Sequence, residues 1–162
     1  MTDADTSDAA EYEVAVVGGG PAGLTAALYT TRLGHRTTLI DRGGGRAAMM
    51  LDTHNVIGVT EDVSGNEFLE TARHQVEAYG ADVRRGMVTE AARAADGRIR
   101  LSSTDGDVVA DRVVFATGFS DGHADPPLLR TGRGLHPCLH RAPYMFVAEP
   151  VAATGPGAGG AP

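Results

Sequence analysis

The sequence predicts an α/β fold in which a parallel sheet carries a small antiparallel meander, inserted before the last parallel strand. A β-branched run at residues 14–17 leads through glycines into a helical pattern and then a second strand, which is how a βαβ unit begins. Two Asp-Gly pairs between residues 94 and 107 separate short strand-like runs, as expected for hairpins. The apolar run 112–118 then has the character of a buried closing strand.

Composition limits the classes of function. The chain has 162 residues, of which 42% are hydrophobic, enough for one domain with a core. All 14 basic residues are arginines, which excludes mechanisms that need a Schiff-base or P-loop lysine. A net charge of −7 argues against a nucleic-acid partner, and no apolar run is long enough to span a membrane. One cysteine cannot form an internal disulfide, so we expect a cytoplasmic location.

The N-terminal segment differs in character from the rest of the chain. Residues 1–12 are acidic and polar, and they lack the basic and apolar regions of a signal peptide. We therefore expect a disordered tail over 1–12, followed by the α/β domain over 13–125.

A glycine-rich turn joins the first strand to the first helix. Gly18, Gly20 and Gly23 match the pattern G-x-G-x-x-G, and Pro21 and Ala22 begin the helix. In this context the first glycine allows a tight turn, the second lets the backbone approach a pyrophosphate, and the third lets helix and strand pack closely. The helix N-terminus offers free N–H groups to the phosphates. The pattern predicts a Rossmann-like, dinucleotide-binding domain.

An acidic residue ends the second strand. Asp41 lies close to the spacing of roughly 20 residues at which such folds place the acid that binds the adenosine ribose. An acid there favours FAD or NAD over NADP, because it would repel a 2′-phosphate. Arg42 is adjacent, and we interpret it as a solvated residue at the strand end. Periodicity leaves FAD and NAD both open.

A long loop and a second helix follow. The loop 43–59 opens with three glycines, and loops of this length in compact domains usually serve a function. Ser64 and Glu67 form the pattern of a capping box at the helix start. The buried stripe of the helix is expected to include Val76 and Tyr79, and Gly80 to end it.

Five segments together resemble a known family. They are VVGGGPAGLTAALY, LIDRGGG, HNVIG, VVFATG and GRGLHPCLHRAPYMF, in order between residue 14 and about residue 147. In these segments the chain resembles the N-terminal FAD-binding part of the pyridine nucleotide-disulfide oxidoreductase class, most of all thioredoxin reductase and its short relatives. The resemblance implies an FAD-dependent oxidoreductase.

The resemblance also implies roles for single residues. The three fingerprint glycines would hold the FAD pyrophosphate, Asp41 would bind the ribose, Asn55 would lie near the flavin, and the backbone at Val88 would meet the adenine. The full set of FAD contacts implied in this way is Gly18, Gly20, Pro21, Ala22, Gly23, Asp41, Arg42, Gly45, Arg46, Asn55, Val88, Ala116, Thr117 and Gly118.

The lone cysteine falls where the reductases carry Cys-x-x-Cys. Cys138 matches the first cysteine and is the candidate catalytic residue, while Arg141 occupies the second position. A single thiol cannot cycle through an internal disulfide, so the standard dithiol reaction is not expected. Three roles stay open for Cys138: a mixed disulfide with another molecule, a thiolate activated by Arg141 and nearby histidines, or an inert remnant. A metal site at His136, Cys138 and His140 is disfavoured, and no metal is expected.

The C-terminal segment 126–162 is expected to be a linker and a truncated start of an NAD(P)-binding domain. Gly155, Gly157 and Gly160 repeat the fingerprint after a strand-like run, at the place where the family's NAD(P)-binding domain begins. NAD(P)H is then a possible donor whose domain is missing, and a partner chain or a homo-oligomer would complete the fold. Two alternatives to a reduced flavoenzyme stay open: a non-catalytic nucleotide-binding or interaction module, and an NAD-dependent dehydrogenase, which the meander and the ATG strand disfavour.

Overall fold

The computed structural model describes residues 9–54 and 56–119. In chain order the elements are β1 (Ala10–Val17), α1 (Pro21–Arg32), β2 (Thr37–Asp41), the 3-10 helix η1 (Ala47–Met49), α2 (Gly65–Ala78), β3 (Asp82–Arg85), β4 (Val88–Arg93), β5 (Ile99–Ser103) and β6 (Val108–Phe115). All of them lie in the compact unit that ends at Gly118. The boundary expected after residue 125 falls outside the described residues.

The strands form one sheet in the order β3-β2-β1-β6-β5-β4. Strands β3, β2, β1 and β6 pair in parallel, while β4, β5 and β6 pair antiparallel. The two helices are crossover connections between parallel strands, as a βαβ architecture requires. The predicted class, a Rossmann-like α/β domain with a small antiparallel meander, is therefore confirmed.

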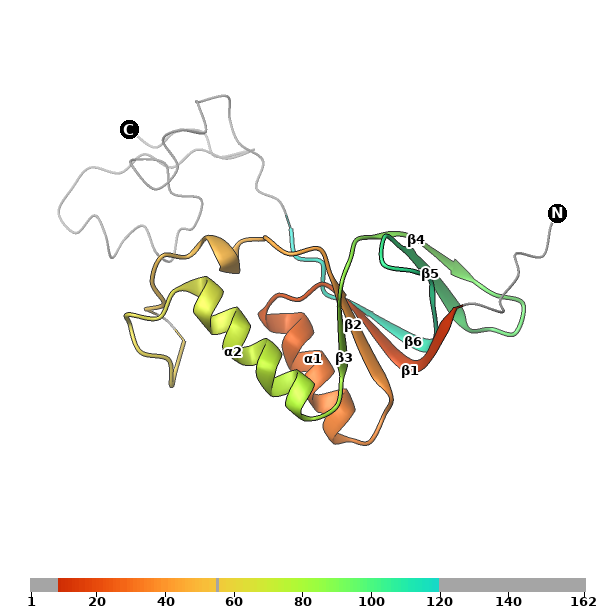
Figure 1. The fold of residues 1–162 in the computed structure, drawn as a ribbon, viewed down its shortest axis with the longest axis horizontal. Helices are drawn as coiled ribbons and strands as arrows, with labels where there is room; N and C mark the ends of the chain where they lie inside the picture. The colour runs from red at the N-terminus through yellow and green to blue at the C-terminus, as the bar shows by residue number, and fades with distance from the viewer. Residues whose placement is uncertain (1–8, 55, 120–162) are drawn as a thin grey trace, which may run out of the picture. The chain divides into compact units, whose positions relative to one another are not determined.

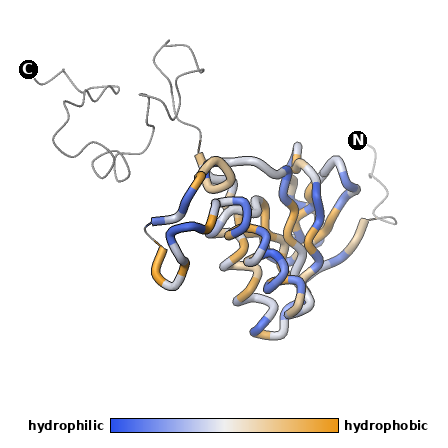
Figure 2. The backbone as a smooth tube through the Cα atoms, turned by 60° about the vertical axis from the view of Figure 1, so that its left-hand side comes forward, coloured by the Kyte–Doolittle hydropathy of each residue, from blue (hydrophilic) through white to orange (hydrophobic). Residues whose placement is uncertain are grey.

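The domain has a separate hydrophobic cluster on each face of the sheet. Helices α1 and α2 cover one face of β1 and β2, and strands β4 and β5 lie on the other side (Figure 1). Along β1, Val14 and Val16 pack toward the helices, whereas Ala15 and Val17 pack toward the meander. Hydrophobic and hydrophilic residues accordingly alternate over short intervals along the helices, which are buried on one face only (Figure 2). Strand β1 is buried on both faces because it is central.

The expectation of a disordered tail up to residue 12 is wrong for its last residues. Strand β1 begins at Ala10, and residues 10–12 pair with Val108–Ala110 of β6. The pairing gives backbone hydrogen bonds to a segment that composition alone marks as polar, and Tyr12 also packs against the meander cluster. Residues 1–8 lie outside the described part of the chain.

Strand β6 differs from its prediction in two ways. The third meander run and the closing strand are one continuous strand, whose first half pairs both with β1 and with β5. Its first residues, Val108–Ala110, are fully buried. Its second half is not the buried strand that the sequence suggested, because Phe115 is 61% exposed.

Helix α2 begins and ends at the predicted places, and one side chain of its predicted buried stripe is exposed. The Ser64 side chain accepts a hydrogen bond from the N–H of Glu67, and the Glu67 carboxylate accepts one from the N–H of Ser64 at 2.9 Å. Val76 is buried and Gly80 follows the C-cap with a positive φ. Tyr79, expected in the buried stripe, is exposed and lies 5.5 Å from the Arg32 guanidinium instead.

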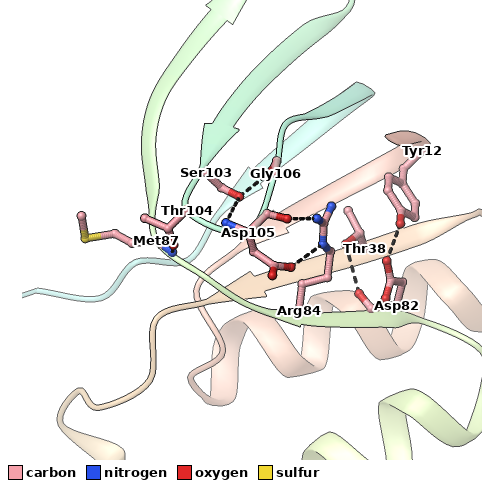
Figure 3. Close-up of polar contacts among 9 residues, drawn as sticks. All are labelled: Tyr12, Thr38, Asp82, Arg84, Met87, Ser103, Thr104, Asp105 and Gly106. Atoms are coloured by element: carbon pink, nitrogen blue, oxygen red, sulfur yellow. Dashed lines mark hydrogen bonds and ion pairs between the residues drawn. The ribbon is translucent and has the colours of Figure 1, made fainter. Parts of the chain in front are cut away.

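A polar network connects β3 with the turn between β5 and β6 (Figure 3). Arg84 of β3 donates from Nε to the Asp105 carboxylate at 2.9 Å and also to the backbone carbonyl of Asp105. On the same strand, Asp82 accepts a hydrogen bond from the Tyr12 hydroxyl, and its carbonyl accepts one from Thr38 at 3.0 Å. The network joins strands that are far apart in the sheet order, so it holds the meander over the parallel strands.

The capping box makes α2 sensitive to a single hydroxyl. We expect Ser64→Ala to lower stability by about 1 kcal/mol, or about 2–4 °C in melting temperature for a chain of this size. Hydrogen bonds from the Ser64 side chain and backbone hold the pKa of Glu67 below its ordinary 4.5. Their contribution is present above that value and is lost as the pH falls through the lowered pKa. The difference between the two melting temperatures should therefore narrow in acid without vanishing, because the hydrogen bond that the Ser64 side chain accepts from the Glu67 N–H does not depend on the carboxylate. A difference that stays constant with pH would contradict this account.

Ionisation of Tyr12 should lower the stability of the fold at alkaline pH. Partial burial and then the hydrogen bond to Asp82 raise the pKa of Tyr12 above its ordinary 10.0. The stabilisation is fully present below that value and is lost as the pH rises through the raised pKa. Urea unfolding of the original chain and Tyr12→Phe, at about pH 8 and about pH 11, should show a larger alkaline loss for the original chain. Equal losses in both proteins would remove Tyr12 from the explanation.

Candidate nucleotide-binding site

The glycine turn is built against the end of β6. Gly18 has φ of +106°, and its N–H donates to the Ile40 carbonyl at 2.9 Å, which continues the pairing of β1 with β2. A Cβ on Gly18 would lie 2.4 Å from the carbonyl oxygen of Ala116. A Cβ on Gly23 would lie 1.8 Å from the carbonyl oxygen of Gly18. Only glycine fits at either position, and the structure brings the fingerprint and the ATG segment into contact.

Gly20 is the exception within this crowded turn. A Cβ there would meet no atom within 4 Å. Gly20 is also the N-cap of α1, and no side chain caps the helix. The first turn holds no acidic residue and begins at Pro21. Pro21 has no N–H and Leu24 donates to the Gly20 carbonyl at 3.0 Å, so Ala22 and Gly23 carry the N–H groups of this turn that have no partner within the helix. These groups and the positive end of the helix dipole lie at the end of α1, beside Gly20.

Asp41, the last residue of β2, lies next to this turn. Its Oδ1 accepts a hydrogen bond from the N–H of Gly19 at 2.9 Å, and its Oδ2 lies 3.5 Å from Nη2 of Arg73. The carboxylate is 15% exposed. A Cβ on Gly19 would lie 2.7 Å from the Asp41 carboxyl carbon, so this position also requires glycine. The turn and the strand-end acid therefore form one unit.

A cavity of about 400 Å³ opens beyond Asp41, between the end of β2 and helix α2. Its lining includes Asp41, Gly43, Asn66, Arg73 and Arg85. Gly43 and the two following glycines all have positive φ values, so this stretch of the loop turns sharply as it leaves β2. The cavity is mainly polar and three of its lining residues are acidic (Asp41, Glu70 and Glu77), which suits the hydroxyl groups of a sugar better than an apolar ligand.

The remaining predicted residues lie around the same edge or outside the described part. Arg42 is exposed, Gly45 and Arg46 precede η1, and Val88 begins β4. Ala116, Thr117 and Gly118 follow β6, and the N–H of Ala116 donates to the Val17 carbonyl at 2.8 Å. Asn55 and Cys138 lie outside the described residues, together with His136, His140 and Arg141.

Sequence reasoning missed three features. Gly19 occupies a variable position of the fingerprint, yet its N–H binds Asp41. Arg73 directly follows Ala72, which packs against the cluster on the helical face of the sheet, and a charged residue beside an apolar stripe was the signal available. Thr53, in the loop, is 1% exposed and its hydroxyl has no hydrogen-bond partner within the described residues.

Two other kinds of site are missing from residues 9–54 and 56–119. No group of three or more histidine, cysteine or acidic side chains is arranged there to hold a metal ion. No helix in this part of the chain is long and apolar enough to cross a membrane.

The sequence of this chain matches a family profile over most of its length. Residues 12–135 match the profile described as pyridine nucleotide-disulphide oxidoreductase. The chain belongs to this family. In the family's terms, the described residues are its Rossmann-like region with the glycine turn, the strand-end acid and the ATG segment.

Individual members of the family are similar to this chain over part of their length. A component of the Staphylococcus aureus alkyl hydroperoxide reductase is 32% identical over 165 residues, covering 96% of this chain and 32% of that protein. Thioredoxin reductase of Aquifex aeolicus is 39% identical over 79 residues, covering 48% of this chain and 24% of that protein. The structure of a thioredoxin reductase from Gloeobacter violaceus matches with a TM-score of 0.65 and 32% identity, covering 72% of this chain and 37% of the other. This chain thus spans no more than about a third of the length of these curated relatives.

The glycine turn yields a matched pair of variants. Gly20→Ala should leave the melting temperature within a few degrees, because its methyl group meets no protein atom, and should weaken FAD binding at least about tenfold. Gly23→Ala should destabilise the fold by about 3 kcal/mol, because α1 must move away from Gly18. Melting curves and FAD titrations of both variants test this. A Gly20→Ala protein with unchanged FAD affinity would contradict the expectation that the pyrophosphate of FAD approaches the backbone at Gly20.

Proposed function

We propose that this chain is the FAD-binding part of a thioredoxin-reductase-like oxidoreductase. The observation that carries the proposal is the unit formed by the crowded turn, the open space at Gly20 and the Asp41 carboxylate beside it. Family membership supports it, as does the likeness to thioredoxin reductases.

The residues present fit the pyrophosphate of FAD. Gly18 and Gly23 fix the turn by backbone contacts that leave no room for a side chain, whereas Gly20 leaves its own side open. Ala22 and Gly23 would present N–H groups of the first helical turn to the phosphates. The absence of an acidic side chain in that turn of α1 avoids repulsion of a doubly negative group.

Asp41 fits the adenosine ribose. Each of its oxygens has one protein donor close by, Gly19 on Oδ1 and Arg73 on Oδ2. A carboxylate has about four acceptor sites, so acceptor capacity remains for the two ribose hydroxyls. The negative charge favours a ribose without a 2′-phosphate. The adenosine ribose of FAD has no 2′-phosphate, whereas that of NADP has one.

When bound, FAD supplies the hydride and electron transfer, and the residues of this chain bind and orient it. We propose NAD(P)H as the donor, because the family is named for pyridine nucleotides and the C-terminal glycines repeat the fingerprint. Cys138 is the proposed thiol on the acceptor side, in a mixed disulfide instead of an internal one, because Arg141 replaces the second cysteine.

We also propose that further protein, from a partner chain or a second copy, completes the fold around β6. Val114 and Phe115 are exposed at the end of this strand. Large apolar side chains exposed at a strand end are typical of surfaces that another protein segment covers.

The test is FAD binding by the purified chain and by Asp41→Asn. We expect the original chain to show the visible flavin spectrum after incubation with FAD and gel filtration. Asp41→Asn should bind FAD about 10–100-fold more weakly, because hydrogen bonds to a charged acceptor are worth about 1.5–3 kcal/mol. Asp111→Asn is the matched control, since Asp111 is exposed on β6. A folded chain that stays colourless would overturn the proposal and leave a non-catalytic module as the better description.

A further inference from the structure

Arg73 is a partly buried charged side chain that borders the apolar stripe of α2. Leu69, Ala72 and Val76 of this stripe pack against the helical-face cluster, and Arg73 follows directly after Ala72. Burying part of an arginine is unfavourable unless its guanidinium finds a partner. The partner is Asp41, at the end of β2, whose Oδ2 lies 3.5 Å from Nη2 of Arg73.

The Asp41 carboxylate is held from two directions. The N–H of Gly19, in the turn after β1, donates to Oδ1 at 2.9 Å. Arg73, on helix α2, approaches Oδ2. The Arg73 side chain is 33% exposed and the Asp41 side chain 15%, so solvent screens this pair less than a surface pair. Two donors on different oxygens fix both the rotation and the position of a carboxylate.

Arg73 also changes the charge balance at the turn. Asp41 is hydrogen-bonded to the same turn that faces the pyrophosphate, and its negative charge would oppose the approach of the phosphates. Glu70 and Glu77 line the same cavity and add to the negative charge near the turn. Arg85 also lines this cavity and lies near Gly43. Among the described residues, Arg73 is the cation recorded within ion-pair distance of Asp41.

We propose that Arg73 is a positioning residue for the adenosine half of FAD. It holds Asp41 in the orientation that receives the two ribose hydroxyls, and it offsets the charge of that carboxylate beside the pyrophosphate. This inference rests on the proposed function and adds a residue outside the glycine turn, from a helix that contributes no fingerprint position. Because Arg73 acts through Asp41, its effect on binding must depend on the Asp41 carboxylate.

The experiment is a double-mutant cycle read with two probes. The intact chain, Arg73→Met, Asp41→Asn and the double variant are titrated with FAD by flavin fluorescence and with ADP by calorimetry. We expect Arg73→Met to weaken the binding of both ligands about 5–30-fold. In the Asp41→Asn background, the same substitution should weaken their binding by less than about threefold. Arg73→Lys should recover part of the affinity, because it restores the charge without the planar fork.

Controls separate positioning from folding. Arg93→Met removes an arginine whose recorded hydrogen bond is to the Gly97 carbonyl in the β4–β5 hairpin, so it should leave ligand affinity unchanged. Melting temperatures of all variants are measured, and an Arg73→Met protein that is not folded is replaced by Arg73→Gln, which keeps a polar side chain.

The outcomes distinguish this inference from the proposed function. If the intact chain binds FAD and Arg73→Met binds it equally well, or loses the same factor in both backgrounds, the positioning role is overturned while the function stands. If the intact chain binds ADP but not FAD, the flavin function fails and the cycle is decided with ADP. If the intact chain binds neither FAD nor ADP, the proposed function and the positioning role of Arg73 are both overturned.

Discussion

The close contact between the start of α1 and the turn after β1 is the constraint on which the rest of the structure depends. Gly23 packs directly on the carbonyl of Gly18, and Gly18 in turn packs on the carbonyl of Ala116 at the end of β6. These are contacts between backbone atoms, so they leave no tolerance for a side chain. They set the depth at which α1 lies on the sheet, and hence where its N-terminus points. The position of Asp41 follows, because β2 pairs with β1 and its carboxylate bonds to Gly19.

The sequence predicted the features that depend on local chemistry. The glycine turn, the capping box at Ser64 and Glu67, and the Asp-Gly turns of the meander each have a signature within a few residues, and each was found. The sequence did not predict the features that depend on pairing over long distances. Ala10 lies in a strand because β6 is beside it, and the exposure of Phe115 depends on which elements cover β6.

The candidate site shows the same division. The spacing after the glycine turn points to Asp41, whereas no pattern in the sequence pairs Asp41 with Arg73, because the two residues lie on different elements. The position of Arg73 beside the apolar residues of α2 was a signal, but it identifies only a partly buried charge and not the group that pairs with it. A partly buried charged residue that borders an apolar helix face is therefore worth matching against the strand ends that the topology brings beside it.

Strand β1 sits between β2, which follows it closely in the chain, and β6, which is the last strand described. During synthesis, β1, α1 and β2 can assemble long before β6 exists. Until residues 108–115 have left the ribosome, the central strand has an open edge with unpaired N–H and C=O groups. Pairing of such distant segments is slow and exposes the chain to misassembly. In any nascent or cleaved fragment that stops short of β6, one edge of the central strand β1 would therefore be open to pairing with a strand of another chain.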